Sequence, residues 1–183
     1  ATLLGRTFGR DDRHAEAAAA TFTTEPFDAD VVLSGPLNLH LWVEAEGSDA
    51  FWSVTVTDVE PGGASAPITR GALLSSLRAV DQAASRYLDG QLLVAEHTLT
   101  AESVLPVVPG QPFDIDIDVN VTDAVIRAGH RLRVAVSRGS FPRHVLNRAQ
   151  RRKIKGQTII IDQAHPSYLT FLAVEASDGN ALD

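Results

Sequence analysis

The sequence predicts an all-β sandwich with one short helix near the N-terminus, and three features support this prediction. Short runs rich in Val, Ile, Leu and Thr alternate between apolar and polar residues, as strands with one buried face do. Gly- and Pro-containing turn signals separate these runs. Strands and helices do not alternate regularly, which argues against a parallel α/β sheet. The 183 residues are expected to form a single domain, because many sandwiches of this length fold as one unit.

The one convincing helical stretch runs from Asp11 to Ala20, where two aspartates precede an alanine-rich run. Carboxylates near a helix N-terminus interact favourably with the helix dipole, and alanine has the highest helix propensity. A short N-terminal helix is therefore expected.

The clearest strand is predicted at residues 37–45, where apolar residues at odd positions alternate with Asn38, His40 and Trp42. Further strands are predicted at residues 52–59, 92–99, 113–121, 131–137, 158–162 and 168–174. The stretches Pro61 to Gly90 and Gly139 to Gly156 are expected to be irregular loops, longer than is usual in compact domains. Loops of this length are where we expect binding.

The composition indicates a globular protein with a sizeable core, since 44% of the residues are apolar and 21% are charged. No stretch reaches the roughly 18 apolar residues of a membrane helix, so no membrane partner is expected. The chain has no cysteine, which excludes disulfides and thiolate metal sites and fits a cytoplasmic protein, with secretion left open. It also has no methionine, even at position 1, which indicates a piece of a longer protein.

Catalytic motifs are missing from the sequence. The Gly-x-Ser-x-Gly turn of α/β-hydrolases does not occur, and the nearest match, around Ser65, ends in Pro67. His165 lies between Asp162 and Ser167, but such local groups commonly serve backbone hydrogen bonding. The chain alone is therefore predicted not to be an enzyme, and no cofactor is expected.

Two small clusters are weak candidates for ligand binding. Asp114, Asp116 and Asp118 fall on one face of a predicted strand, where calcium binding is one interpretation and a solvated outer face is the favoured one. Trp42 and Trp52 are candidates for stacking on a sugar, against the favoured interpretation that they fill the core or an edge.

The charge distribution is uneven. The net charge is −7, yet residues 127–155 hold ten basic residues and no acidic ones. Phosphate binding is one interpretation, but aromatic residues are nearly absent from this segment, so no nucleic-acid partner is expected. A surface that docks another domain is favoured, because arginine is common in interfaces. The residues assigned to it are Arg138, Arg143, His144, Arg148, Arg151 and Arg152.

Several segments, in order, resemble the C-terminal domain of the X-Pro dipeptidyl-peptidase and cocaine-esterase family of serine hydrolases. They are residues 23–27, 33–36, 57–63, 71–78, 129–137 and 140–142, followed by Asn147, and the resemblance covers about residues 21–175. The chain departs from the family pattern at Leu74, where the family typically has arginine, and in the basic residues after Pro142.

This resemblance implies a jelly-roll, galactose-binding-like sandwich that follows a catalytic α/β-hydrolase domain and packs against it. The catalytic serine, aspartate and histidine of the family belong to that preceding domain, which this chain lacks. The expected function is a non-catalytic domain that stabilises the hydrolase and helps to shape its substrate pocket. An independent carbohydrate-binding module is the alternative, and a homo-oligomer is left open. Gly129 is expected to need a permissive backbone, and Pro142 to fix the exit from the preceding strand.

Overall fold

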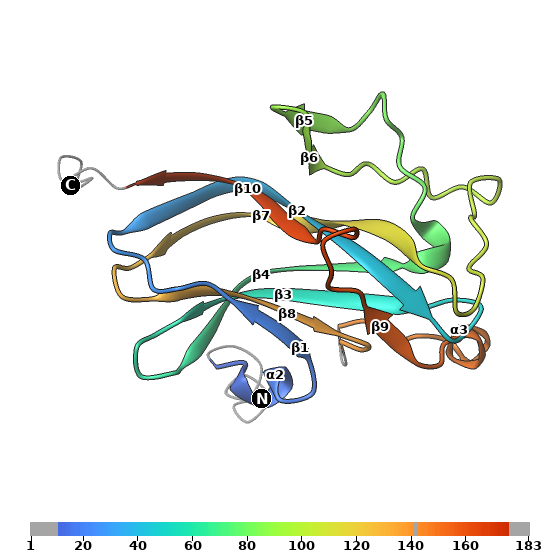
Figure 1. Ribbon diagram of the computed structural model, residues 1–183, viewed down its shortest axis with the longest axis horizontal. Helices are drawn as coiled ribbons and strands as arrows, with labels where there is room; N and C mark the ends of the chain where they lie inside the picture. Colours follow the sequence, from blue (N-terminus) through green and yellow to red (C-terminus); the bar gives the residue numbers. More distant parts are fainter. Residues whose placement is uncertain (1–10, 141–142, 176–183) are drawn as a thin grey trace.

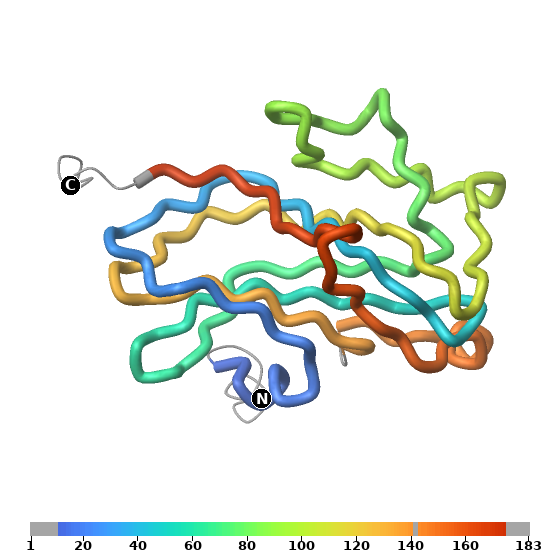
Figure 2. Tube along the Cα trace, viewed as in Figure 1, coloured from blue at the N-terminus to red at the C-terminus, as the bar shows by residue number. Residues whose placement is uncertain are grey.

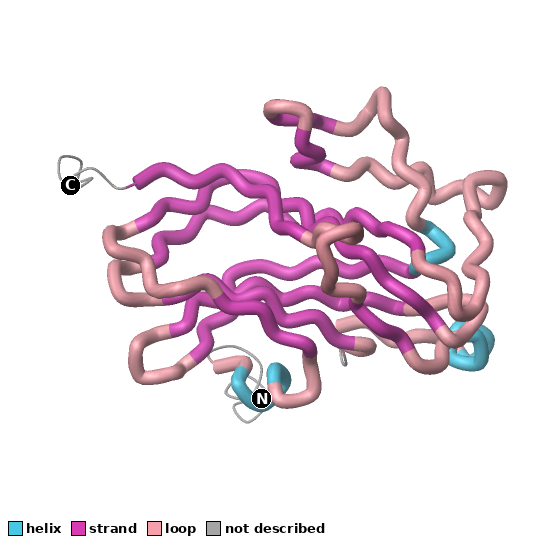
Figure 3. Tube along the Cα trace, in the orientation of Figure 1, coloured by secondary structure: helices cyan, strands magenta, loops and turns pink. Residues whose placement is uncertain are grey.

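The structure is a computed structural model that describes residues 11–140 and 143–175, and it confirms the all-β sandwich with a short N-terminal helix (Figure 3). Pro142 lies outside the described residues, so its expected role is not addressed. The elements are α2 (Arg13–Glu16), β1 (Ala20–Thr23), β2 (Val31–Ala45), β3 (Phe51–Val59), β4 (Ser65–Leu74), the 3-10 helix η1 (Ser75–Leu77), β5 (Arg86–Leu88), β6 (Gln91–Val94), β7 (Phe113–Ile126), β8 (Arg131–Ser137), α3 (Arg148–Lys153), β9 (Gln157–Ile159) and β10 (Tyr168–Glu175).

The main sheet is antiparallel and curls into two layers (Figure 1). Its strand order is β1-β8-β3-β4-β7-β2-β10, and β9 also pairs with β2. Strands β1, β8, β3 and β4 form one layer, and β7, β2 and β10 form the other. The two layers are joined at a narrow seam, where Gly71 of β4 pairs with Val119 of β7.

The core fills the space between the layers, and the alternation along β2 predicts its share of that core correctly. Leu37, Leu39 and Leu41 are at most 4% exposed and face the other layer. The opposing strands contribute Trp52, Val54, Val56, Leu132, Val134 and Val136, and β7 adds Ile115, Ile117 and Val119. Burial of these apolar side chains is the main stabilising contribution to the fold.

A two-stranded hairpin of β5 and β6 lies outside the main sheet and packs against β2 and β10 (Figure 2). It covers part of the polar face of β2, where Asn38 is fully buried. The outward face of β2 is therefore sheltered locally, although its side chains are polar.

The helix and loop predictions need correction. The helix expected at residues 11–20 is limited to Arg13–Glu16, because Ala20 already starts β1 and pairs with Val136. The stretch 61–90 is not an irregular loop, since it contains the ten-residue strand β4. The stretch 139–156 contains α3, which begins with a capping box formed by Asn147 and Gln150.

Helix α2 is tied to the sheet by a buried carboxylate. Glu16 is 7% exposed, and its Oε2 accepts a hydrogen bond of 2.7 Å from Arg133 Nη1. Its Oε1 accepts from Ser65 Oγ at 2.5 Å and from Thr57 Oγ1 at 3.1 Å. One side chain therefore links α2 to β3, β4 and β8.

The predicted turn at Gly129 is confirmed, since this glycine has a φ of +80°. Among the described helices, none is long and apolar enough to span a bilayer.

Candidate functional site

An open apolar groove of about 570 Å³ lies between the two edges of the curled sheet. One side is formed by the end of β1 and the other by β10 and the loop that precedes it (Figure 1). The lining residues are Phe22, Thr23, Thr24, Leu39, Leu41, Leu132, Val134, Ile159, Ile161, Asp162, His165, Pro166, Ser167, Tyr168, Leu169 and Phe171. Since β1 and β10 are the end strands of the sheet, each has one edge with no strand partner among the described residues.

The floor of this groove is the hydrophobic core itself. Leu39 and Leu41 reach it from one layer, and Leu132 and Val134 reach it from the other. At its rim, Phe22 is 37% exposed and Ile161 is 73% exposed. Contiguous apolar surface of this kind is characteristic of protein interaction sites.

A second groove of about 320 Å³ extends the first one. The two share Phe22, Ile159 and Ile161, so they form one trough along β1 and β9. The far end of the trough is lined by Arg138 and Gln157, and the buried Oε1 of Gln157 has no hydrogen-bond partner. We refer to these two connected grooves as the edge trough.

The basic residues predicted for docking do not form one cluster. Arg138 lines the edge trough, while Arg143 and His144 line a separate polar hollow of about 750 Å³ with His97 and Asp118. The His144 ring also packs at 5.6 Å from the ring of Phe51.

The remaining predicted docking residues, Arg148, Arg151 and Arg152, are exposed on α3. Within residues 11–140 and 143–175, none of these three arginines forms an ion pair. By contrast, Arg131 and Arg133 pair with Glu25 and Glu16. The unpaired part of the basic segment is therefore concentrated on α3.

The two tryptophans differ in exposure, which corrects the stacking prediction for one of them. Trp52 is 1% exposed, and its Nε1 donates to Ser75 Oγ at 2.8 Å, so its ring is inside the core and closed to a sugar. Trp42 is partly exposed and packs edge-on against His165, with ring centroids 4.6 Å apart.

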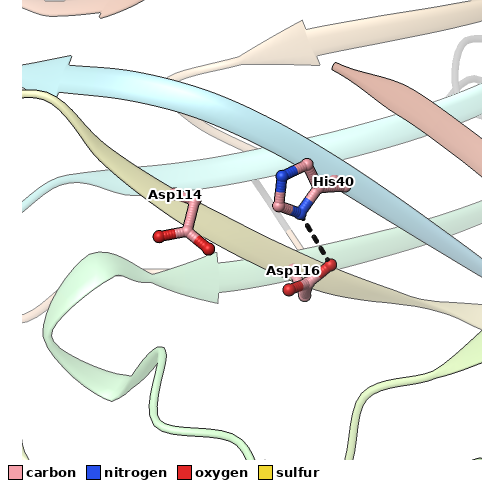
Figure 4. A group of neighbouring side chains, drawn as sticks. All are labelled: His40, Asp114 and Asp116. Carbon is pink, nitrogen blue, oxygen red and sulfur yellow. Dashed lines mark hydrogen bonds and ion pairs between the residues drawn. The ribbon is translucent and has the colours of Figure 1, made fainter. Parts of the chain in front are cut away.

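The carboxylates predicted as weak metal candidates are divided by the fold. Asp114 and Asp116 lie beside His40 of the neighbouring strand, and the three side chains offer ligand atoms within 4.8 Å of one another (Figure 4). Asp118 lies apart from this group, next to the hollow lined by His97. His40 was missed because its partners depend on the register of β2 and β7, although its place on the polar face of β2 follows from the alternation.

Hydrogen bonding to Asp116 raises the pKa of His40, against an opposing effect of burial. The ring of Tyr168 stacks on His40 at 4.8 Å, and burial is the main cause that raises the pKa of this tyrosine. The aromatic and acidic side chains on this face therefore favour a positively charged group between them.

The serine and histidine side chains considered as catalytic groups in the sequence have structural roles. Ser65 is fully buried at the start of β4 and donates its hydroxyl to Glu16. His165 Nδ1 lies 2.9 Å from Asp162 Oδ1, while Ser167 Oγ accepts from the backbone of Trp42. Within this described loop, His165 and Ser167 do not form a hydrogen bond with each other.

Solved structures show the same fold. A CocE/NonD family hydrolase from Staphylococcus aureus superimposes with a TM-score of 0.73 at 18% identity, covering 90% of this chain and 32% of that one. An aminopeptidase from a marine sediment thaumarchaeon gives a TM-score of 0.68 at 19% identity, covering 91% and 28%. An α-amino acid ester hydrolase gives 0.66 at 21% identity, covering 89% and 27%.

Sequence comparisons also find relatives named as hydrolases. A protein of Mycobacterium bovis, provisionally named a serine esterase, is 28% identical over 127 residues, and its counterpart in Mycobacterium tuberculosis gives the same values. The match covers 69% of this chain and 20% of those relatives, so the chain spans only a minor part of their length. The family described as the X-Pro dipeptidyl-peptidase C-terminal non-catalytic domain matches residues 5–170, and the chain therefore belongs to this family.

Proposed function

We propose that this domain stabilises the catalytic domain of a serine hydrolase in the same polypeptide and helps to shape its substrate pocket. The parent enzyme would be of the esterase or dipeptidyl-peptidase type, as the names of the relatives suggest. The observation that supports this role is the edge trough, where core side chains of both layers form the floor and the exposed Phe22 and Ile161 lie at the rim, between two strand edges that have no strand partner among the described residues. A neighbouring domain that covers the trough would bury this apolar surface and add to the stability of both parts.

The test uses the parent protein with substitutions at the rim of the trough. We expect Ile161→Glu to lower the thermal midpoint of the parent and its turnover of a chromogenic ester, because a carboxylate would be buried at the interface. Val121→Glu is the matched control, since Val121 of β7 is 69% exposed, close to the 73% of Ile161, but lies outside the trough. Equal effects of the two substitutions would refute docking through the trough.

A direct assay of the isolated chain tests the non-catalytic role. We expect no serine-dependent turnover of chromogenic esters or prolyl amides. Turnover that is lost on treatment with a serine-directed inhibitor would overturn the proposal.

The carbohydrate-binding alternative now depends on Trp42 alone, because Trp52 is enclosed in the core. Binding to a glycan array that is lost on Trp42→Ala would favour this alternative.

A further inference from the structure

A compact group of metal-ligating side chains lies on the polar face of β2 and β7, and none of its members lines the edge trough. We propose that His40, Asp114 and Asp116, together with Asn38, bind a divalent first-row transition metal ion such as Zn²⁺. Their donor atoms come from two adjacent antiparallel strands, and those of His40 and the two aspartates lie within 4.8 Å of one another (Figure 4). This proposal is independent of the docking function.

The strand register creates the group. His40 pairs directly with Asp116 across β2 and β7, and Trp42 pairs with Asp114. Because alternate residues share a face, Asn38 and His40 stand on the same side of β2 as the two aspartates on β7. The rigid sheet therefore holds the ligand set in place.

The spacing around Asp116 fits a metal ion. Its Oδ1 lies 3.1 Å from His40 Nδ1 and 2.9 Å from Asn38 Nδ2. Ligands around a tetrahedral zinc ion with bonds of about 2.1 Å are separated by about 3.4 Å, a few tenths of an ångström more than these two distances. A small displacement of the proton-bearing groups would thus convert this hydrogen-bonded arrangement into a coordination shell.

Asn38 gives a second, independent indication. Its side chain is fully buried, and its Oδ1 has no hydrogen-bond partner. The oxygen and nitrogen of a carboxamide exchange places on a half-turn. Such a turn would bring the orphan oxygen next to Asp116 Oδ1 at the expense of the hydrogen bond from Asn38 Nδ2, so it would be stable only with a cation between the two oxygens. The metal would satisfy a buried acceptor that the protein leaves unpaired.

The donor chemistry favours a transition metal over calcium. Calcium prefers an all-oxygen shell of six to eight ligands, whereas an imidazole with carboxylates suits Zn²⁺ and its neighbours. The site is sheltered on one side, since the side chains of His40 and Asp116 are 13% and 16% exposed and the ring of Tyr168 stacks on His40, while Asp114 is exposed. Restricted access of water strengthens the attraction between a cation and the carboxylates.

The experiment is a titration of the chelator-treated chain with ZnCl₂ at pH 7.5, followed by calorimetry and thermal unfolding. We expect one saturable site, a higher thermal midpoint with Zn²⁺, and no comparable effect of CaCl₂. His40→Ala or Asp116→Asn is expected to weaken binding at least tenfold.

His165→Ala is the matched control, because His165 and Asp162 form a similar imidazole–carboxylate pair at 2.9 Å outside the group. This variant should keep the affinity of the unaltered chain. NMR of the unaltered chain gives a second measurement that does not depend on the folding of the His40 and Asp116 variants. The imidazole signals of His40 should shift with saturation at one equivalent of Zn²⁺, ahead of those of His165. The proposal is overturned if no saturable binding occurs, if His40→Ala binds as tightly as the unaltered chain, or if His165 responds first.

Discussion

Glu16 shows how a single residue determines the attachment of a whole segment. Three polar partners from three strands converge on its carboxylate, and Arg133 supplies the opposite charge. The sequence predicts the helix that carries Glu16 but not these contacts, because the partners lie 41 to 117 positions away along the chain. Periodicity reports which face of an element is buried, and it contains no information on which distant polar group will pair with which.

Replacement of Glu16 by alanine should therefore be costly. It removes the charge partner of Arg133 and the acceptor of the Thr57 hydroxyl, and it leaves Ser65 Oγ with only Thr57 Oγ1 to donate to. We expect Glu16→Ala to lower the free energy of unfolding by about 3 kcal/mol in urea denaturation. Glu25→Ala is the control, since Glu25 also pairs with an arginine but its side chain is 93% exposed. The denaturation midpoint of this variant should equal that of the unaltered chain. Similar losses in the two variants would contradict this account.

Asp11 provides a pH-dependent contribution at the same end of the chain. Hydrogen bonds from the Arg13 side chain are the main cause that lowers the pKa of Asp11 from 3.8 to about 2. Because the folded-state pKa is depressed, the associated stability is present above pH 4 and is lost as the pH falls towards 2. We expect Arg13→Gln to return the pKa of Asp11 towards 3.8 in an NMR titration. The pKa of Asp162, which is lowered mainly by His165, should stay unchanged and serves as the internal control.

At the scale of elements, β4 shows where sequence patterns mislead. Pro67 and Gly71 are both unfavourable within strands, and both fall in the stretch from Pro61 to Gly90 that the sequence predicts to be a loop. Pro67 is tolerated because the register between β3 and β4 shifts at Val56 and Thr57, beside its pairing position. Irregular pairing of this kind removes the need for a regular ladder hydrogen bond and is invisible in a single sequence.

Gly71 is needed in β4 because it lies at the seam between the layers, where the backbone of β7 comes close. A Cβ atom there would lie 2.5 Å from the backbone oxygen of Asp118 and 3.1 Å from Val119 Cα. We expect Gly71→Ala to push β4 and β7 apart and to reduce the free energy of unfolding by about 1–3 kcal/mol. Gly62→Ala is the control, since nothing lies within 4 Å of a Cβ at that position. Chemical denaturation measures the free energy of unfolding of both variants. Equal values for Gly71→Ala and Gly62→Ala would show that the seam tolerates the methyl group.

At the scale of the whole molecule, the fold class was predictable and the site geometry was not. The apolar alternation on β2 predicts its buried face, because side-chain direction is a local property of a strand. The edge trough depends on which strands end the sheet, and that order joins β1 to β8 and β2 to β10 from opposite parts of the chain. Phe22 and Ile161, far apart in sequence, meet in the trough for this reason.

The uneven charge of the molecule leads to the last prediction. Within the described residues, Arg127, Arg131 and Arg133 of the basic segment 127–155 pair with acidic residues. Arg148, Arg151 and Arg152 on α3 are exposed and form no ion pair with the part of the chain that the structure describes, so their field extends into solvent. If α3 faces an acidic surface of the catalytic domain, these charges speed the association of the two domains and leave the fold of this one unaffected.

Reversal of the three charges by Arg148→Glu, Arg151→Glu and Arg152→Glu should leave the thermal midpoint of the isolated chain nearly unchanged, because exposed groups without partners contribute little to stability. Association with a separately produced catalytic domain should slow by about tenfold at low salt. Since ions screen exposed charges over about 10 Å at 0.1 M and over about 3 Å at 1 M, this difference should disappear at high salt. Stopped-flow mixing at several salt concentrations measures both effects.

The control compares a single charge reversal on α3, Arg151→Glu, with one on β5, Arg86→Glu. Both side chains are exposed, so the comparison separates the effect of where the charge lies from the effect of net charge. Equal slowing by these two substitutions would mean that net charge, and not the surface of α3, governs the encounter.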